Sequence, residues 1–120
     1  MNPSTPPNRE VALIEALAAA FGPPPSEIIL GIGDDCAALD LGGPDYLLWT
    51  VDTLVEGVHF HLAALPLGQL GRKALAVNVS DIAAMGGEPL YALLSLGWPP
   101  HRDLEGALEQ IGRASCRERV

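Results

Sequence analysis

The chain has 120 residues, of which 48% are hydrophobic, and carries a formal net charge of −8 at pH 7. This length and composition suit one small globular domain and exclude general disorder. The acidic balance argues against nucleic acid as the main partner, because phosphate backbones are bound by Lys and Arg. A nucleotide held through metal ions is compatible with it, since the cation reverses the local sign of charge.

The sequence also argues against a membrane or secreted protein, and against a protein stabilised by disulfides or zinc. No apolar run approaches the length of a membrane helix, and the apolar stretch 11–21 contains Glu15 and lacks a basic leader, which argues against a signal peptide. Cys36 and Cys116 lie far apart and match neither a disulfide framework nor a zinc site. We therefore expect a reducing, cytoplasmic setting without a membrane partner.

The first third of the chain predicts one helix and two short strands. Residues 1–8 should form a flexible arm, after which Asn8 can cap a helix over 9–21, with apolar residues at helical spacing. Gly22 and the three prolines after it should end this helix. Short apolar runs then predict strands over 28–30 and 36–41.

The segment 46–55 is the clearest predicted strand, since it is rich in β-branched and aromatic residues. Alternation along such a strand places Leu48, Thr50 and Asp52 on one face. Thr50 and Asp52 would then be two residues apart on that face, a spacing that lets both side-chain oxygens reach one ion.

The second half predicts a helix, a strand and the start of a third helix. Pro66 should open a helix over 66–85, with Asn78 and Asp81 on one face and Gly86-Gly87 as its end. The nearly continuous apolar run 89–97 predicts a strand covered on both sides, and Asp103 should begin the last helix. This order predicts an α+β fold, a small mixed sheet with helices on one face, whose apolar strands a second subunit could cover.

Residues 111–120 differ from the rest of the chain. Three of the seven Lys and Arg residues fall here, and the preceding helical pattern stops. We interpret this decapeptide as a foreign tail, with an ordinary basic helix end as the alternative. The expected organisation is therefore an arm over 1–8, a domain over 9–110 and the tail, which we exclude from functional reasoning.

Acidic residues recur in three separated segments: the Gly31–Asp35 turn, the Asp52 strand and the Asp81 helix. Carboxylates gathered without Lys or Arg repel one another unless a cation lies between them, and Mg²⁺ prefers oxygen ligands shared with phosphates. Solvated acids in a turn or on a helix face are the alternative for the turn and for Asp81. A ligand role is indicated more strongly for Asp52 than for the other acids, because Asp is disfavoured within strands.

Other motifs carry less information. The glycine turn lacks the third Gly of a dinucleotide fingerprint, and the chain contains no P-loop. His59 and His61 have no suitable neighbours for zinc; either could donate to a phosphate oxygen, and His61 is best interpreted as a surface residue. Arg72 and Lys73 could contact phosphate, although such a pair is more often solvated.

Taken together, three motifs closely resemble the thiamine-monophosphate kinase family, within the superfamily of aminoimidazole ribonucleotide synthetase. The resemblance covers residues 9–110, and its motifs are specific in combination. They are GIGDDCA at 31–37, TVDTLVEGVHF at 50–60 and KALAVNVSDIAAMG at 73–86.

The resemblance implies roles for individual residues. Asp35, Thr50 and Asp52 look like Mg²⁺ ligands, with Val51 contributing only through its backbone, and Asp81 matches a carboxylate that bridges several Mg²⁺ ions. His59 matches a residue lining the thiamine-phosphate site. The implied fold is the N-terminal domain of the superfamily, which forms a homodimer.

The implied reaction is Mg²⁺-assisted transfer of the γ-phosphoryl group of ATP to thiamine monophosphate, without an assigned catalytic base. Such kinases continue well beyond 120 residues, so we expect this chain to be an N-terminal fragment that is inactive alone. Two alternatives stay open, namely another ATP-dependent enzyme of the superfamily and a non-catalytic, metal-binding dimerisation module.

Overall fold

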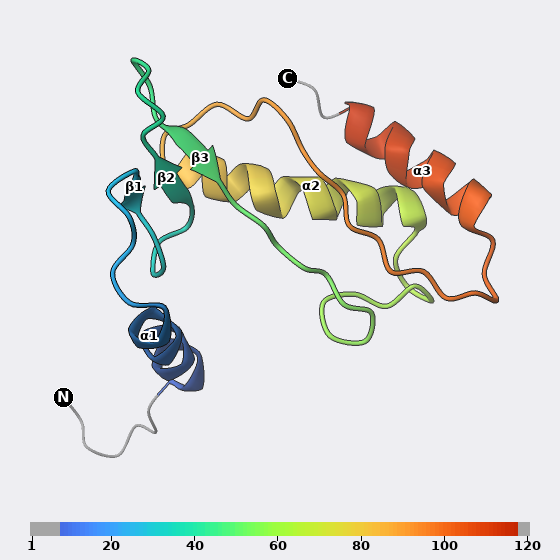
Figure 1. Ribbon diagram of the computed structural model, residues 1–120. Coiled ribbons are helices and arrows are strands. Elements are labelled where there is room, and N and C mark those ends of the chain that lie inside the picture. Colours follow the sequence, from blue (N-terminus) through green and yellow to red (C-terminus); the bar gives the residue numbers. More distant parts are fainter. Residues whose placement is uncertain (1–7, 118–120) are drawn as a thin grey trace. The chain divides into compact units, whose positions relative to one another are not determined.

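The computed structural model describes residues 8–117 and contains both helices and a small sheet (Figure 1), which confirms the predicted α+β class. The chain divides into two compact units, residues 1–50 and 51–120, and each is described by itself. Most of the arm predicted over residues 1–8 lies outside the described residues. The elements are α1 (Arg9–Phe21), β1 (Ile28–Leu30), β2 (Ala37–Leu39), β3 (Leu47–Trp49), α2 (Leu67–Ala84) and α3 (Leu104–Arg117).

In the first unit, α1 has the predicted bounds because both of its ends are capped as the sequence indicates. The Asn8 side-chain oxygen accepts a hydrogen bond from the Glu10 amide at 3.1 Å. Gly22 ends the helix with φ 72°, a conformation that glycine adopts without steric cost. None of the residues of α1 is buried, so capping rather than packing defines this helix.

The sheet has the order β1-β2-β3 and both of its pairings are antiparallel. The prediction of a mixed sheet is wrong for the described strands, because the connections between them are too short for the crossover that a parallel pair needs. Cys36 and Ala38 are 2% and 3% exposed and form the buried centre of this unit. How helices cover the sheet stays a prediction.

The strand β3 is shorter than the predicted strand over 46–55. In the register of the sheet, Leu47 pairs with Leu39 and Trp49 with Ala37. Ala37 is the first residue of β2, so β2 offers no pairing partner to residues after Trp49. The backbone beyond Trp49 has no ladder partner and leaves the strand. The prediction that Thr50 and Asp52 share a strand face is therefore wrong.

In the second unit, α2 agrees with the predicted helix over 66–85. It begins after Pro66 and ends in a Schellman motif, in which the Gly86 amide donates to the Ala83 carbonyl at 2.9 Å and the Gly87 amide to Ile82 at 3.0 Å. Gly86 has φ 70°, the left-handed conformation that this motif requires. The glycine pair is thus the physical reason for the helix end.

The helix α3 begins where Asp103 predicts it, since the Asp103 carboxylate accepts hydrogen bonds from the Glu105 amide at 3.1 Å and the Gly106 amide at 3.3 Å. The predicted stop at residue 111 is wrong, because α3 continues to Arg117. Ile111 follows Ala107 by one helical turn, and both are buried. The foreign origin of 111–120 stays a prediction, and residues 118–120 lie outside the described residues.

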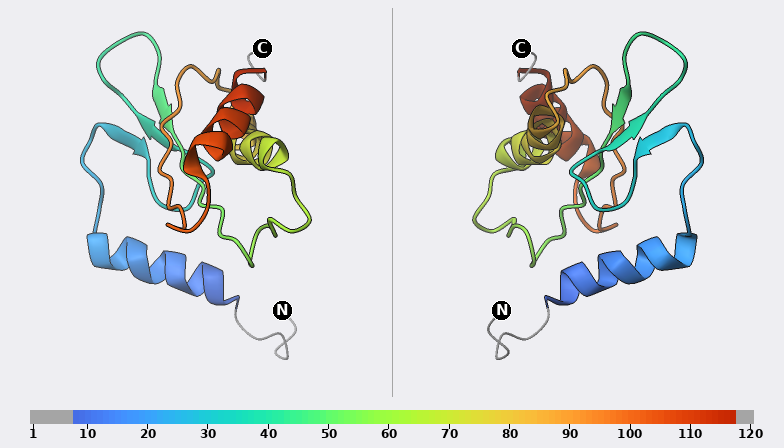
Figure 2. Two further views of the ribbon diagram at one scale, coloured as in Figure 1. Left: turned by 90° about the vertical axis from the view of Figure 1, so that its right-hand side faces the viewer. Right: turned by 90° about the vertical axis from the view of Figure 1, so that its left-hand side faces the viewer.

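The helices α2 and α3 lie side by side, as the two views in Figure 2 show. Gly71 is buried at their crossing, where an added Cβ would lie 2.7 Å from the Ile111 carbonyl oxygen. Only a residue without a side chain permits the two backbones to approach this closely. Ile111, 7% exposed, is therefore part of the core of the second unit.

The apolar segment 89–97 forms no strand, so the predicted covered strand is wrong. It runs between α2 and α3 without a ladder partner, and its large apolar side chains are exposed: Leu90, Tyr91, Leu93, Leu94 and Leu96. An apolar sequence becomes a strand only where a neighbouring backbone supplies hydrogen bonds. Cover by a second subunit stays a prediction. Within residues 8–117, no helix combines the length and apolar character needed to cross a membrane.

Candidate functional site

The glycine–aspartate turn, residues 31–35, connects β1 to β2 in the first unit. Gly33 has φ 113°, where a side chain would be strained, and the Asp35 amide donates to the Asp34 carboxylate at 3.1 Å. The side chains of Asp34 and Asp35 are exposed. Asp34 thus stabilises the turn itself, while the Asp35 carboxylate takes no part in it.

Two predicted metal ligands meet in this unit. The Thr50 hydroxyl donates to the Asp35 carbonyl oxygen at 3.2 Å across 15 residues of sequence. The pairing of Ala37 with Trp49 explains the contact, because Asp35 precedes β2 by one residue and Thr50 directly follows β3. The antiparallel register therefore brings the first motif and the start of the second together.

The other predicted ligands belong to the second unit. Val51 is 86% exposed and Asp52 is exposed, both in the irregular segment after β3. Asp81 is half-buried on α2, and one turn before it the Asn78 amide group donates to the Ala74 carbonyl at 2.9 Å. Asn78 is therefore bonded to its own helix.

The donor chemistry of these residues fits Mg²⁺. All are oxygen donors, and among residues 8–113, whose side chains the structure describes, the carboxylates of Asp35 and Asp52 enter no hydrogen bond or ion pair. Among the same residues, no three His, Cys, Asp or Glu side chains lie close enough to share an ion. Asp35 and Asp81 belong to different units, so convergence of the carboxylates on a metal stays a prediction.

The histidine turn, residues 55–60, is a compact loop of the second unit. The Val58 and His59 amides both donate to the Val55 carbonyl, at 3.1 and 2.9 Å, and the Gly57 amide donates to Phe60 at 2.8 Å. Gly57 has φ 84°, which the tight path requires. The backbone itself therefore closes this turn.

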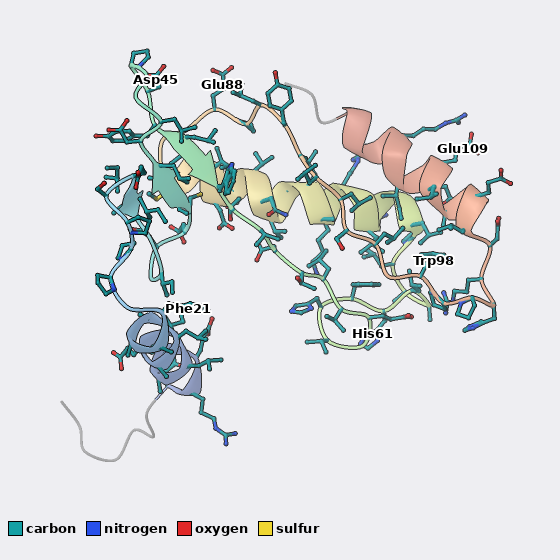
Figure 3. All side chains as sticks on the ribbon, in the orientation of Figure 1. Phe21, Asp45, His61, Glu88, Trp98 and Glu109 are labelled. Carbon is teal, nitrogen blue, oxygen red and sulfur yellow. The ribbon has the colours of Figure 1, made fainter. Side chains whose placement is uncertain are left out.

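The ring of His59 also takes part in the turn. Its Nδ1 accepts a hydrogen bond from the Val55 amide at 2.8 Å, while the side chain as a whole is exposed. The ammonium group of Lys73, from α2, donates to the carbonyl oxygen of His59. His61 lies just beyond the turn and is exposed, as expected of a surface residue (Figure 3).

A second contact reaches the histidine turn from the segment before α3. The Arg102 guanidinium lies 3.8 Å from the Glu56 carboxylate, and both side chains are partly exposed. The indole of Trp98, labelled in Figure 3, donates to the Arg102 carbonyl at 3.1 Å and closes that segment on itself. Surface ion pairs of this kind contribute about 0–1 kcal/mol, so this contact adds little to the stability of the turn.

Sequence reasoning assigned neither Lys73 nor Arg102 to this loop. Lys73 was predicted to be solvated or to contact phosphate, but its ammonium group binds a backbone carbonyl 14 residues earlier. No local spacing rule relates two residues so far apart. The only signal in the sequence is that His59 and Lys73 stand in two motifs of one family resemblance.

Comparison with known proteins places most of the chain in one family. Residues 33–118 match the family described as AIR synthase related protein, N-terminal domain. Over 73 residues the chain is 48% identical to thiamine-monophosphate kinase of Escherichia coli strain K12, covering 61% of this chain and 22% of that protein. No solved structure matches the chain.

Two further relatives with the same name are similar over comparable lengths. Thiamine-monophosphate kinase of Bacillus subtilis is 49% identical over 74 residues, or 62% of this chain and 23% of that protein. The Synechococcus elongatus protein is 43% identical over 79 residues, or 66% of this chain and 24% of that protein. The matched region thus spans less than a quarter of each of these relatives.

Proposed function

Since the chain belongs to the AIR synthase related family, through the N-terminal domain of that family, we propose that it is part of a thiamine-monophosphate kinase. The observation that carries the proposal is the 48% identity to a protein of that name over 73 residues. The proposed reaction moves the γ-phosphoryl group of ATP to the phosphate of thiamine monophosphate. One P–O bond of ATP breaks, one forms in thiamine diphosphate, and ADP leaves.

The chemistry of the acceptor limits what the protein must supply. The attacking atom is a phosphate oxygen that is already ionised at neutral pH, so no general base is assigned. Catalysis of such a transfer consists of positioning and charge neutralisation. A site made of exposed oxygen donors and one ordered imidazole suits that task, because it needs no paired nucleophile and base.

The proposed metal ligands are the side chains of Asp35, Thr50, Asp52 and Asp81, with the backbone of Val51. Their hard oxygen donors suit Mg²⁺, and the exposed carboxylates of Asp35 and Asp52 are accessible to it. Bound Mg²⁺ would neutralise the negative charge of the polyphosphate. His59, ordered by the histidine turn, would contact thiamine monophosphate.

Isothermal titration with Mg²⁺ and a non-hydrolysable ATP analogue tests this assignment. We expect Asp52→Asn and Asp81→Asn each to weaken binding about tenfold, which corresponds to about 1.4 kcal/mol. Asp45→Asn is the matched control, since Asp45 is an exposed acid of the loop between β2 and β3 (Figure 3) and should leave the titration unchanged. If both site variants bind as the parent does, the metal assignment is wrong.

The same titration separates the alternatives. Nucleotide binding that thiamine monophosphate does not affect would favour another ATP-dependent enzyme of the family. Metal binding without nucleotide would favour a non-catalytic, metal-binding dimerisation module.

The activity of the chain alone belongs to the same proposal. Because the matched region covers 22% of the E. coli relative, we expect the 120 residues to bind ligand without measurable turnover. A cytoplasmic homodimer is part of the proposal. Robust kinase activity of the purified chain would contradict the expectation of an inactive fragment.

A further inference from the structure

The first residue of the histidine turn is held by a hydrogen bond whose acceptor can take up a proton. The Val55 amide donates to Nδ1 of the His59 ring at 2.8 Å. Imidazole is the side chain that ordinarily changes its charge between about pH 5 and 8. We propose that the histidine turn is a pH-sensitive switch, closed while the His59 ring is neutral and opened when acid protonates it. This inference goes beyond the proposed function, because it concerns the conformation of the turn and requires no ligand.

The closed turn accepts only one protonation state of His59. A backbone amide always donates, so Nδ1 supplies the lone pair to Val55 and carries no proton. The neutral ring therefore carries its single proton on Nε2, and a second proton can enter only at Nδ1. Two N–H donors would then face each other, and no hydrogen bond could form between them. Protonation of the ring and closure of the turn thus exclude each other, so the contact is present at neutral pH and lost as the pH falls.

The opening is confined to one end of the turn. The carbonyl of Val55 still accepts from the Val58 amide at 3.1 Å and from the His59 amide at 2.9 Å, and neither of these groups titrates. The Val55 amide, in contrast, has the His59 ring as its hydrogen-bond partner within the part of the chain that the structure describes. Acid therefore frees the entry of the turn, while the backbone bonds at its centre remain.

The charges around the turn give a protonated ring no reason to stay in place. The ammonium group of Lys73, from α2, lies on the His59 carbonyl and disfavours a second positive charge. Glu56 is an acid of the same turn, but its carboxylate is paired with Arg102 at 3.8 Å. His61, exposed just beyond the turn, can only add positive charge as the pH falls. Among residues 8–113, no carboxylate forms an ion pair with the ring.

NMR of the isotopically labelled 120-residue chain follows closure and protonation separately. The spin coupling across the N–H···N bond between the Val55 nitrogen and Nδ1 reports closure, and the carbon-bound ring protons of His59 report its charge. From about pH 8 to about pH 5 we expect the coupling to disappear as the ring becomes charged. Exchange of the Val55 amide, corrected for its intrinsic pH dependence, should become about fivefold faster, as expected for the loss of one exposed hydrogen bond.

Three results of this titration would overturn the switch. One is a coupling that persists after the ring is charged, and another is a ring that is still neutral at the acid end of the titration. The third is simultaneous loss of amide protection throughout the chain, because the transition would then be global unfolding instead of a local opening. Amide signals outside residues 55–61 should therefore stay in place.

Two substitutions assign the transition to one ring. His59→Asn replaces the imidazole by an amide that acid does not protonate in this range, so exchange of the Val55 amide should show no transition. His61→Gln is the matched control, since it removes the neighbouring exposed imidazole and should leave the transition as in the parent chain. A transition that survives in His59→Asn, or one that is lost in His61→Gln, would show that His59 is not the switch.

A third substitution tests the contribution of α2. Lys73→Met removes the support of the His59 carbonyl and also a positive charge that disfavours the protonated ring. Both changes favour the open turn, so we expect it to open at a higher pH than in the parent chain. Lys73→Arg keeps the charge and should open close to the pH of the parent. An opening that Lys73→Met leaves unchanged would overturn the role of Lys73.

Discussion

The glycine–aspartate turn and the histidine turn are built alike but supported differently. Each contains one glycine with positive φ, Gly33 at 113° and Gly57 at 84°, and each exposes a side chain that we assign to ligand binding. The first turn is supported by the Asp34 carboxylate and the Thr50 hydroxyl, both of which contact backbone. The second is supported by charged groups from α2 and from the segment before α3.

The difference indicates two ways of preparing a binding residue. The imidazole of His59 is ordered by the protein alone, because its own turn and Lys73 supply its partners. The carboxylate of Asp35 has no such partner among the described side chains of residues 8–113, and in the proposed function Mg²⁺ would order it. In the proposed function, an ordered imidazole and an exposed carboxylate would serve different parts of a ligand that carries phosphate and Mg²⁺.

The largest effect on this comparison is expected when the histidine turn loses the support of α2. We expect Gly71→Ala to lower the free energy of unfolding by about 2 kcal/mol, because the new Cβ overpacks against the Ile111 backbone. Lys73 would shift with the helix and protection of the His59 amide from hydrogen exchange should fall. Chemical denaturation followed by circular dichroism, with residue-level hydrogen exchange, measures both effects.

Gly68→Ala is the matched control for that variant. It is the same substitution in the same helix, but its Cβ would lie 3.9 Å from the Gln110 carbonyl, an ordinary contact. Its higher helix propensity should raise the free energy of unfolding by up to about 1 kcal/mol. Equal effects of the two substitutions would show that the close approach at Gly71 is not limiting.

A second test acts on the histidine turn itself. Gly57→Ala places a side chain at φ 84° without any clash, so we expect only the backbone cost of about 1 kcal/mol and faster exchange of the Val58 and His59 amides. Gly57→Asn should recover part of the loss, since Asn tolerates this conformation. Identical exchange in the Ala variant and the parent would mean that the turn does not need a glycine.

The smallest effect is expected in the glycine–aspartate turn. Thr50→Val removes the hydroxyl bonded to the Asp35 carbonyl and should cost roughly 0.5 kcal/mol, since this hydrogen bond lies in an exposed setting. Thr50→Ser keeps the hydroxyl and should be nearly neutral. Denaturation curves measure the difference, and a loss in Thr50→Ser as large as in Thr50→Val would assign the effect to the methyl group instead.

The helices were predictable because their signals are local. Asn8, Gly22, Gly86 and Asp103 each act on backbone groups within a few residues, so the ends of α1 and α2 and the start of α3 could be inferred from spacing alone. Ile111 shows the limit of that reasoning. A change of composition predicted the end of α3 there, but burial against Gly71 outweighs composition.

The strands were predictable in place but not in length. Residues 46–55 and 89–97 have the composition of strands, yet β3 ends at Trp49 with its partner β2, and 89–97 has no partner in the described structure. A strand exists only as one side of a pair, so its bounds depend on residues that its own sequence does not contain.

The amino-acid sequence by itself determined the capped helices, the α+β class and the oxygen-rich motifs, because each depends on neighbouring residues or on side-chain chemistry. Tertiary structure alone decided that Thr50 meets Asp35 and that Lys73 holds His59. Those contacts join residues 15 and 14 positions apart, and only the folded backbone sets the distance between them.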